Sequence, residues 1–281
     1  MIDSILRKPA ILVALGTLAL LPAAKGKTLY SEDFSGYLDG QTPTHWTTSS
    51  NWGVVTSGRG NSYVATDSDG GQYYSSTLKF SEIDDPAEAS ILTFSFDLQV
   101  ENYRGLSAGG VGTFRITLRP DNVTDERYSI GLGYANISGN TLFFYAGAGT
   151  SPTPSAANAI GYDADNGFAE GFRLGAIGNQ PVNGTRGNSY HFELTLDTGT
   201  GGITVITTNL SDPTQIATYS DQWQPIAVTK EGSLIFTTGV ASQGKMIVNH
   251  VAIAAIPEPS VYGLIGIGMA LFGLKLRGRS R

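Results

Sequence analysis

Strict alternation of apolar and polar residues recurs along this chain and restricts its fold more than any other feature. The run Leu92-Thr-Phe-Ser-Phe-Asp-Leu-Gln-Val100 has an apolar side chain at every second position, and the pattern returns at 114–119, 128–134 and 190–197. A strand with this period has one apolar and one polar face. Gly, Asn, Asp and Pro cluster between such segments, at 138–140, 197–202 and 211–213. We therefore predict an all-β fold, an antiparallel β-sandwich.

Composition fits a single core of this kind. The chain has 281 residues, of which 41% are hydrophobic, with 36 Gly and no Cys. Without cysteine, neither a thiolate nucleophile nor a Cys-ligated metal site exists. Setting the two terminal segments aside leaves roughly 230 residues, which suits one large sandwich better than two ordinary domains. We assign that domain to 27–255.

Charge is unevenly distributed along the chain. The net charge is −6, while residues 1–24 carry +1 and residues 257–281 carry +3, so residues 25–256 hold −10. A nucleic-acid partner requires clustered Lys and Arg to meet the phosphates. The acidic body therefore argues against nucleic acid.

The N-terminus has the three parts of a secretory signal peptide. A basic start with Arg7 and Lys8 precedes an apolar run from Ala10 to Leu21, and small residues follow. As a helix that run is too short to span a membrane core of ~30 Å. We predict a signal helix within residues 1–26, and a buried N-terminal helix is the alternative.

The C-terminus, 256–281, also has three parts. Pro257 and Pro259 bracket Glu258 and hold the segment extended, because proline disfavours a helix at and before its own position. The apolar, Gly-rich stretch 261–274 follows and is expected to form a transmembrane helix, marginal in length for a permanent span. The tail is basic and favours the cytoplasmic side. Its basic residues are Lys275, Arg277, Arg279 and Arg281.

This ending resembles the PEP-CTERM sorting signal of certain bacteria, with Pro257-Glu258-Pro259 as the motif. The resemblance implies export and transient anchoring in the inner membrane by the C-terminal helix. It further implies processing by a membrane-embedded, exosortase-type enzyme that recognises the motif. The mature protein is then expected at the cell surface or in the extracellular polysaccharide matrix. A simple single-span anchor is the alternative.

The body resembles concanavalin A-like and laminin-G-like jelly rolls. The resemblance rests on the opening segment 30–40 with His45-Trp46 and 51–55, the hairpin segments 190–197 and 202–206, and the closing segment 246–253. In such domains the closing strand commonly pairs near the first. Family membership would imply glycan or surface recognition and, less often, glycan hydrolysis.

The longest irregular stretch is 146–166, rich in Gly, Ala, Ser and Pro. Strand patterns of the same kind continue on both sides of it. We therefore interpret it as an insertion into the sandwich, with a domain linker as the alternative.

The sequence offers no convincing catalytic set. The nearest approach to the paired carboxylates of a glycosidase is Glu82-Ile-Asp84-Asp85-Pro86-Ala-Glu88, where the spacing is too long and Pro86 breaks a regular strand. His45, His191 and His250 show no metal-binding spacing, although His191 shares a strand face with Glu193 and Asp197. We predict that the protein is not an enzyme.

Two kinds of binding residue are candidates. Sugar-binding jelly rolls typically stack exposed aromatic side chains on the sugar, and large aromatics also serve the core. Calcium takes oxygen ligands at alternate loop positions, a pattern that ordinary Asp and Asn turns also give. The aromatic candidates are Trp46, Trp52, Tyr73, Tyr74 and Trp223, and the weaker calcium candidates are Asp67, Asp69, Asp163 and Asp165.

Three functions remain open at this stage. The leading hypothesis is an exported, non-enzymatic surface or matrix protein that binds polysaccharide. The others are a glycan-cleaving enzyme of the jelly-roll type and a purely structural matrix scaffold.

Overall fold

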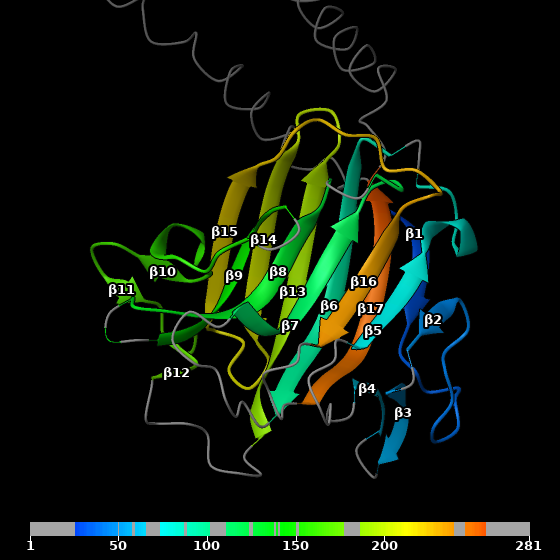
Figure 1. The fold of residues 1–281 in the computed structure, drawn as a ribbon, viewed down its shortest axis with the longest axis horizontal. Helices are drawn as coiled ribbons and strands as arrows, with labels where there is room; N and C mark the ends of the chain where they lie inside the picture. Colours follow the sequence, from blue (N-terminus) through cyan, green and yellow to red (C-terminus); the bar gives the residue numbers. More distant parts are fainter. Residues whose placement is uncertain are drawn as a thin grey trace, which may run out of the picture.

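The protein is an all-β, antiparallel sandwich in a computed structural model that describes residues 26–49, 51–57, 60–65, 74–86, 89–101, 111–123, 126–137, 139, 141–149, 152–176, 186–238 and 245–256. Two large sheets, here called sheet A and sheet B, face each other (Figure 1). Sheet A contains β1 Lys27–Glu32, β3 Trp52–Ser57, β4 Gly60–Ala65, β6 Ile91–Glu101, β13 Arg186–Asp197, β14 Gly202–Asn209, β15 Ile216–Gln222 and β17 Lys245–Ile256. Sheet B contains β2 Trp46–Thr48, β5 Tyr74–Lys79, β7 Val111–Arg119, β8 Tyr128–Ala135, β9 Thr141–Ala148, β12 Gly175–Ala176 and β16 Ser233–Thr238.

Sheet A brings the two ends of the domain together. Its order is β15-β14-β13-β6-β17-β4-β3, and β1 also pairs with β17. Thr28 lies opposite Ala254 and Glu32 opposite Val251 in that antiparallel pair. The predicted pairing of the closing strand near the first is thus confirmed, as is the hairpin of β13 and β14.

Sheet B has the order β12-β9-β8-β7-β16-β5-β2. Its strand β7 shows how the alternation is used. In β7 the residues Phe114, Ile116 and Leu118 are buried and point into the sandwich, whereas Arg115 and Arg119 point outward and stay partly exposed. The alternation that predicted the strands therefore also assigns their two faces.

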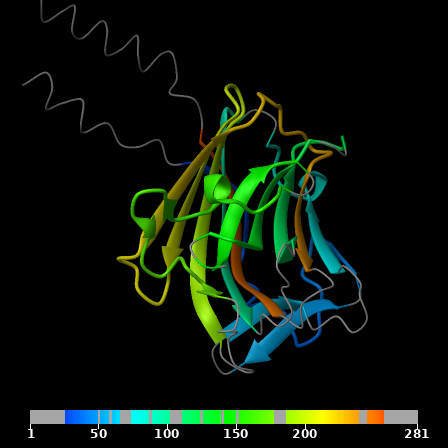
Figure 2. The same ribbon diagram turned by 60° about the vertical axis from the view of Figure 1, so that its left-hand side comes forward.

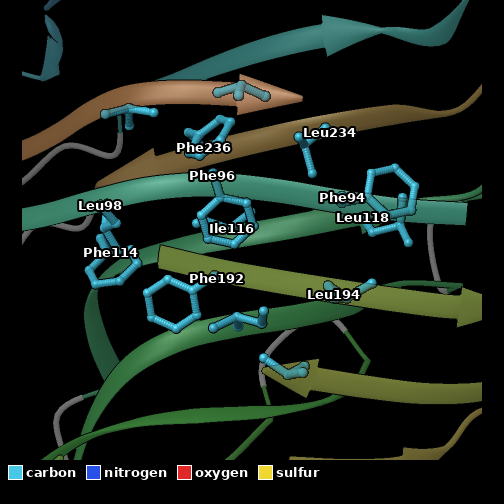
Figure 3. Close-up of a cluster of buried hydrophobic side chains, with 14 of the residues drawn as sticks. Phe94, Phe96, Leu98, Phe114, Ile116, Leu118, Phe192, Leu194, Leu234 and Phe236 are labelled. Carbon is cyan, nitrogen blue, oxygen red and sulfur yellow. The ribbon is translucent and has the colours of Figure 1, made fainter. Parts of the chain in front are cut away.

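The core fills the space between the sheets and is dense in aromatic rings. Phe96 of β6 stacks on Phe192 of β13 at a centroid distance of 5.3 Å, and meets Phe236 of β16 edge to face at 6.0 Å (Figure 3). Phe144 of β9 lies 5.0 Å from Phe192. Each such ring buries about 150–250 Å² and contributes more than its area alone when paired in this way. These contacts join strands of both sheets.

An insert follows β9 and folds back on the sandwich. Residues 152–176 contain the short 3-10 helix η2 Ala156–Asn158 and the small hairpin of β10 Tyr162–Asp163 and β11 Gly167–Phe168, and end in β12. The hydroxyl of Tyr190 on β13 donates a 2.7 Å hydrogen bond to the Gly171 carbonyl, and Phe172 is fully buried in the main core. The insert stays close to the sheets in both views (Figures 1 and 2). It is therefore an insertion into the sandwich and not a linker.

The predicted signal peptide, 1–26, and sorting signal, 256–281, lie outside the described residues except for Gly26 and Ile256. Within the described ranges, no helix is long and apolar enough to span a membrane. A second short 3-10 helix, η1 Phe80–Glu82, follows β5 and buries Phe80.

Candidate ligand-binding face

The outward side of β5, β16 and β7 is a mostly polar surface with three cations, here called the basic face. Lys79 is exposed, and Arg115 and Arg119 are partly exposed. Thr117 and Ser233 are almost covered, and the remaining members are partly exposed. None of these outward residues is acidic. The basic face comprises Ser75, Thr77, Lys79, Arg115, Thr117, Arg119, Ser233, Ile235 and Thr237.

Strand register places the cations in a defined pattern. Ser233 lies opposite Lys79 on one side and opposite Arg119 on the other. Neighbouring strands are ~4.8 Å apart, which puts the backbones of Lys79 and Arg119 about 10 Å from each other. Arg115 stands four residues before Arg119 on the same strand face, about 13 Å away. The three side chains therefore mark the corners of a triangle with hydroxyl-bearing residues between them.

Part of Arg119 is already anchored. Its guanidinium donates a 3.1 Å hydrogen bond to the Asn122 carbonyl in the turn beyond β7. In the same turn the Asp121 carboxylate accepts the backbone N–H of Val123 at 2.7 Å. These bonds fix the end of the strand from which Arg119 projects.

The insert covers the other half of the outward side of sheet B. A Cβ at Gly133 of β8 would clash with Pro154 Cγ and lie 2.6 Å from Tyr145 Cδ1, and a Cβ at Gly131 would lie 2.6 Å from the Tyr145 hydroxyl. Only glycine leaves room for the tyrosine ring and the proline to lie on this strand. Phe143, Tyr145 and other apolar residues bury themselves there in a second, small cluster. The insert therefore covers the outward side of β8 and β9, and the basic face begins at the next strand, β7.

Tyr145 marks that border. Register places it beside Gly131, which in turn lies opposite Arg115. Burial raises the pKa of the Tyr145 phenol, and the positive charge of the neighbouring Arg115 opposes that rise. At neutral pH the phenol stays neutral next to a charged guanidinium.

The outward side of sheet A is chemically different. His191 Nδ1 lies 2.5 Å from an Asp97 carboxylate oxygen on the neighbouring strand, and His250 lies opposite Asp97 on the other side. The hydrogen bond that His191 donates to the Asp97 carboxylate raises the pKa of His191, burial opposes this rise, and the charge of Glu193 adds to it. His191 and Glu193 share a strand face, as the sequence predicted. Asp97 joins them from the neighbouring strand, and sequence spacing does not reveal this third residue.

The aromatic candidates fall mostly in the core. Trp46, Trp52 and Trp223 are only 7%, 5% and 8% exposed. Trp46 packs on Tyr63 and Phe236, and Trp223 packs on Tyr128. Buried indoles present no face to a sugar, so the expectation of exposed stacking residues is not met at these three positions. Tyr74 is partly buried and packs against the core, and Tyr73 lies outside the described residues.

The acidic segment after β5 is engaged in ion pairs. Asp84 lies 2.9 Å from Lys27 Nζ, Asp85 lies 3.3 Å from Lys230 Nζ, and Glu82 lies 3.6 Å from His45 Nδ1. All of these groups are well exposed. They match the expectation of a solvated acidic loop.

The calcium candidate at the β10–β11 hairpin has a turn role. One Asp163 oxygen accepts the backbone N–H groups of Asp165 and Asn166 at 2.8 and 3.0 Å, and these bonds lower the pKa of Asp163. Asp67 and Asp69 lie outside the described residues. Among the residues that the structure describes, no three His, Asp or Glu side chains come together as a metal site requires.

Sequence reasoning did not single out the basic face, although a signal for it existed. Arg115 and Arg119 occupy polar positions of an alternating strand, so their shared outward face was evident. What the sequence does not give is the strand order. Lys79 and Ser233 come from distant segments, and only the pairing of β5, β16 and β7 brings them beside the arginines.

No protein-family model matches the chain, and no curated protein matches it. Among solved structures it is similar to lectin II from Ulex europaeus, at 14% identity and a TM-score of 0.42, over 80% of this chain and 97% of that one. It is also similar to peanut lectin in a complex with a 9mer peptide, at 10% identity and a TM-score of 0.45, over 80% and 97%. A lectin from Bauhinia forficata in complex with GalNAc gives 13% identity and a TM-score of 0.43, over 80% and 97%. Scores this low leave the ligand of this chain to be argued from its own residues.

Proposed function

We propose that this chain is an exported, non-enzymatic surface or matrix protein that binds polysaccharide through the basic face. The observation that supports it is the outward side of β5, β16 and β7. Lys79 is exposed there, and the arginines and the hydroxyls of Ser75, Thr77 and Thr237 are partly exposed, whereas the insert shields the neighbouring strands. Oriented polar groups on rigid strands are well suited to hydrogen-bond a polyhydroxylated chain. The export and sorting part of the proposal rests on the two terminal segments of the sequence.

The binding test uses the full exported protein on a broad array of polysaccharides. Thr237→Trp places a bulky ring on the middle strand of the basic face, between Ser75 and Arg115. Thr195→Trp places the same ring on the outward side of sheet A, where Thr195 is likewise partly exposed. Binding to at least one polysaccharide, lost in Thr237→Trp and kept in Thr195→Trp, supports the proposal. Absence of binding to every polysaccharide contradicts it and favours a structural scaffold.

The sorting test is the intact mass and location of the protein in native cells and in cells lacking the processing enzyme. Loss of the segment after Pro257-Glu258-Pro259, with the product at the surface or in the matrix, is the expected outcome. If the protein from native cells still carries Arg281 and stays in the membrane, the C-terminal segment is a simple membrane anchor and not a sorting signal.

The non-enzymatic part is tested separately. Incubation with the bound polysaccharide is expected to release no oligosaccharides. Release that Glu193→Gln abolishes would instead establish the glycan-cleaving alternative, with the outward side of sheet A as its site.

A further inference from the structure

The basic face differs in charge from the rest of the molecule. Residues 25–256 carry a net charge of −10, and the outward side of sheet A includes Asp97, Glu193 and Asp197. The basic face of sheet B has three cations and no carboxylate among its nine residues. The basic face is therefore locally positive on a molecule whose net charge is negative. This contrast is the observation from which the class of ligand is inferred.

We infer that the basic face is selective for an anionic polysaccharide, one that carries carboxylate or sulfate groups along its chain. This inference rests on the proposed function and names the chemical class of its ligand. Lys79, Arg115 and Arg119 are the groups that meet the anions, and the hydroxyls of Ser75, Thr77 and Thr237 meet the sugar hydroxyls.

The geometry favours a polymer over a single small anion. Backbone spacings of about 10 Å between Lys79 and Arg119, and about 13 Å between Arg119 and Arg115, spread the cations over the face, so that each can meet a different anion along one extended chain. Arginine meets a carboxylate or sulfate with two parallel donors, which adds direction to each contact. Contacts at exposed cations are individually weak, so affinity comes from several anions on one chain binding together.

The same charges disfavour nucleic acid. Duplex DNA carries one phosphate per ~1.7 Å, and proteins that hold it tightly make about 6–10 phosphate contacts. Three cations on a body of net charge −10 fall short of that number. The carboxylates of Glu82, Asp121 and Glu231 follow or precede the strands of the face within three residues and would repel a densely charged rod. A polysaccharide with about one anion per sugar or fewer places its charges far enough apart to match the face.

The probe pair for the test is polygalacturonate and its methyl-esterified form, which share a backbone and differ in charge. Duplex DNA is the third probe. We compare the full exported protein with Arg115→Gln/Arg119→Gln. The control variant, Lys27→Gln/Lys230→Gln, removes two positive charges outside the basic face, at residues that pair with Asp84 and Asp85.

The expected result is binding of polygalacturonate that weakens about tenfold on esterification and about tenfold in the arginine variant, with the lysine control close to the parent. Affinity also falls as salt rises from about 50 to about 200 mM, because screening shortens the reach of the exposed cations.

A second variant keeps the test decisive if the arginine pair is needed for folding. Ile235→Glu adds a negative charge between the cations and removes neither a guanidinium nor a hydroxyl, because Ile235 lies between Thr77 and Thr117 on the same face. It is expected to weaken binding of the acidic polymer about tenfold and to spare binding of the esterified one.

Three outcomes overturn the inference. Equal binding of both polymers would leave polysaccharide binding intact and remove only the selectivity for anions. Equal losses in the arginine and lysine variants would place the anion elsewhere on the molecule. DNA binding as tight as polygalacturonate binding at the same salt would make the face a general polyanion site. If no polysaccharide of either charge binds, the proposed function itself fails.

Discussion

The indole N–H of Trp46 donates a 2.7 Å hydrogen bond to the hydroxyl of Tyr30, and both residues are buried. Trp46 belongs to β2 of sheet B and Tyr30 to β1 of sheet A, so this bond joins the two layers near the N-terminal edge. It also explains why Trp46 is a structural residue. Its one donor is satisfied inside the protein, and its ring packs on Tyr63 and Phe236.

Tyr30→Phe is therefore expected to destabilise the protein by about 1–3 kcal/mol, because the Trp46 N–H is left buried without an acceptor. Urea unfolding measures this difference. Tyr162→Phe, at a half-buried tyrosine on the insert, serves as the control. Equal losses in the two variants would contradict the role assigned to the bond.

Gly133→Ala is expected to loosen the insert. The added Cβ would clash with Pro154 Cγ and lie 2.6 Å from Tyr145 Cδ1, so the tyrosine and the proline loop must shift, at a cost of about 1–3 kcal/mol. Limited proteolysis within 152–176 should become faster. The control is Gly36→Ala, where no atom lies within 4 Å of the new Cβ. Unchanged cleavage in Gly133→Ala would mean that the insert does not depend on this contact.

The His191–Asp97 pair predicts a pH dependence. The folded-state pKa of His191 is raised above 6.5, first through its hydrogen bond to Asp97. The charged imidazole therefore adds stability that is fully present below pH 6.5 and is lost as pH rises through the folded pKa. Asp97→Asn should lower the His191 pKa in an NMR titration and shrink the stability gained at acidic pH. A His191 pKa unmoved by Asp97→Asn would sink this account.

Alkaline pH tests the buried tyrosines. Burial raises the pKa of Tyr63 from 10.0 to about 12, and its hydrogen bond to Ser76 opposes that rise. Because the unfolded state releases this proton first, the contribution of Tyr63 to stability falls between pH 10 and pH 12. Ultraviolet titration should show delayed ionisation in the folded protein relative to the urea-unfolded protein. Superimposable titration curves would be incompatible with a buried phenol.

Much of the fold follows from alternation alone. The runs at 92–100, 114–119, 128–134 and 190–197 all became strands with the predicted apolar face inward. The stretch 146–166 was predicted as an insertion from the strand patterns on its two sides, although 146–148 belong to β9 and the insert continues to Ala176. The pairing of 246–253 with the first strand was expected from the resemblance to concanavalin A-like jelly rolls. The strands and the insertion depend on local sequence pattern, so they can be predicted without knowing the order of strands in the sheets.

The candidate site was harder to predict because it depends on strand order. Asp97 and His191 are distant in sequence and meet only through the register of β6 and β13. The same holds for Lys79 and Arg119, which Ser233 brings into one row. The prediction of exposed aromatic residues at the binding site failed at the three tryptophans for a related reason. A tryptophan beside a turn has the same local sequence whether its ring points outward or, like that of Trp46, into the core.

The most direct test of the central claim is the acetylation rate of individual lysines, followed by mass spectrometry, with and without bound polysaccharide. Lys79 is exposed on the basic face, and Lys27 is exposed on β1 of sheet A with a 66% exposed side chain. We predict that bound polysaccharide slows the acetylation of Lys79 and leaves that of Lys27 unchanged. Bound polysaccharide that leaves Lys79 as reactive as before, or that slows Lys27 equally, would show that the basic face is not where this protein holds its ligand.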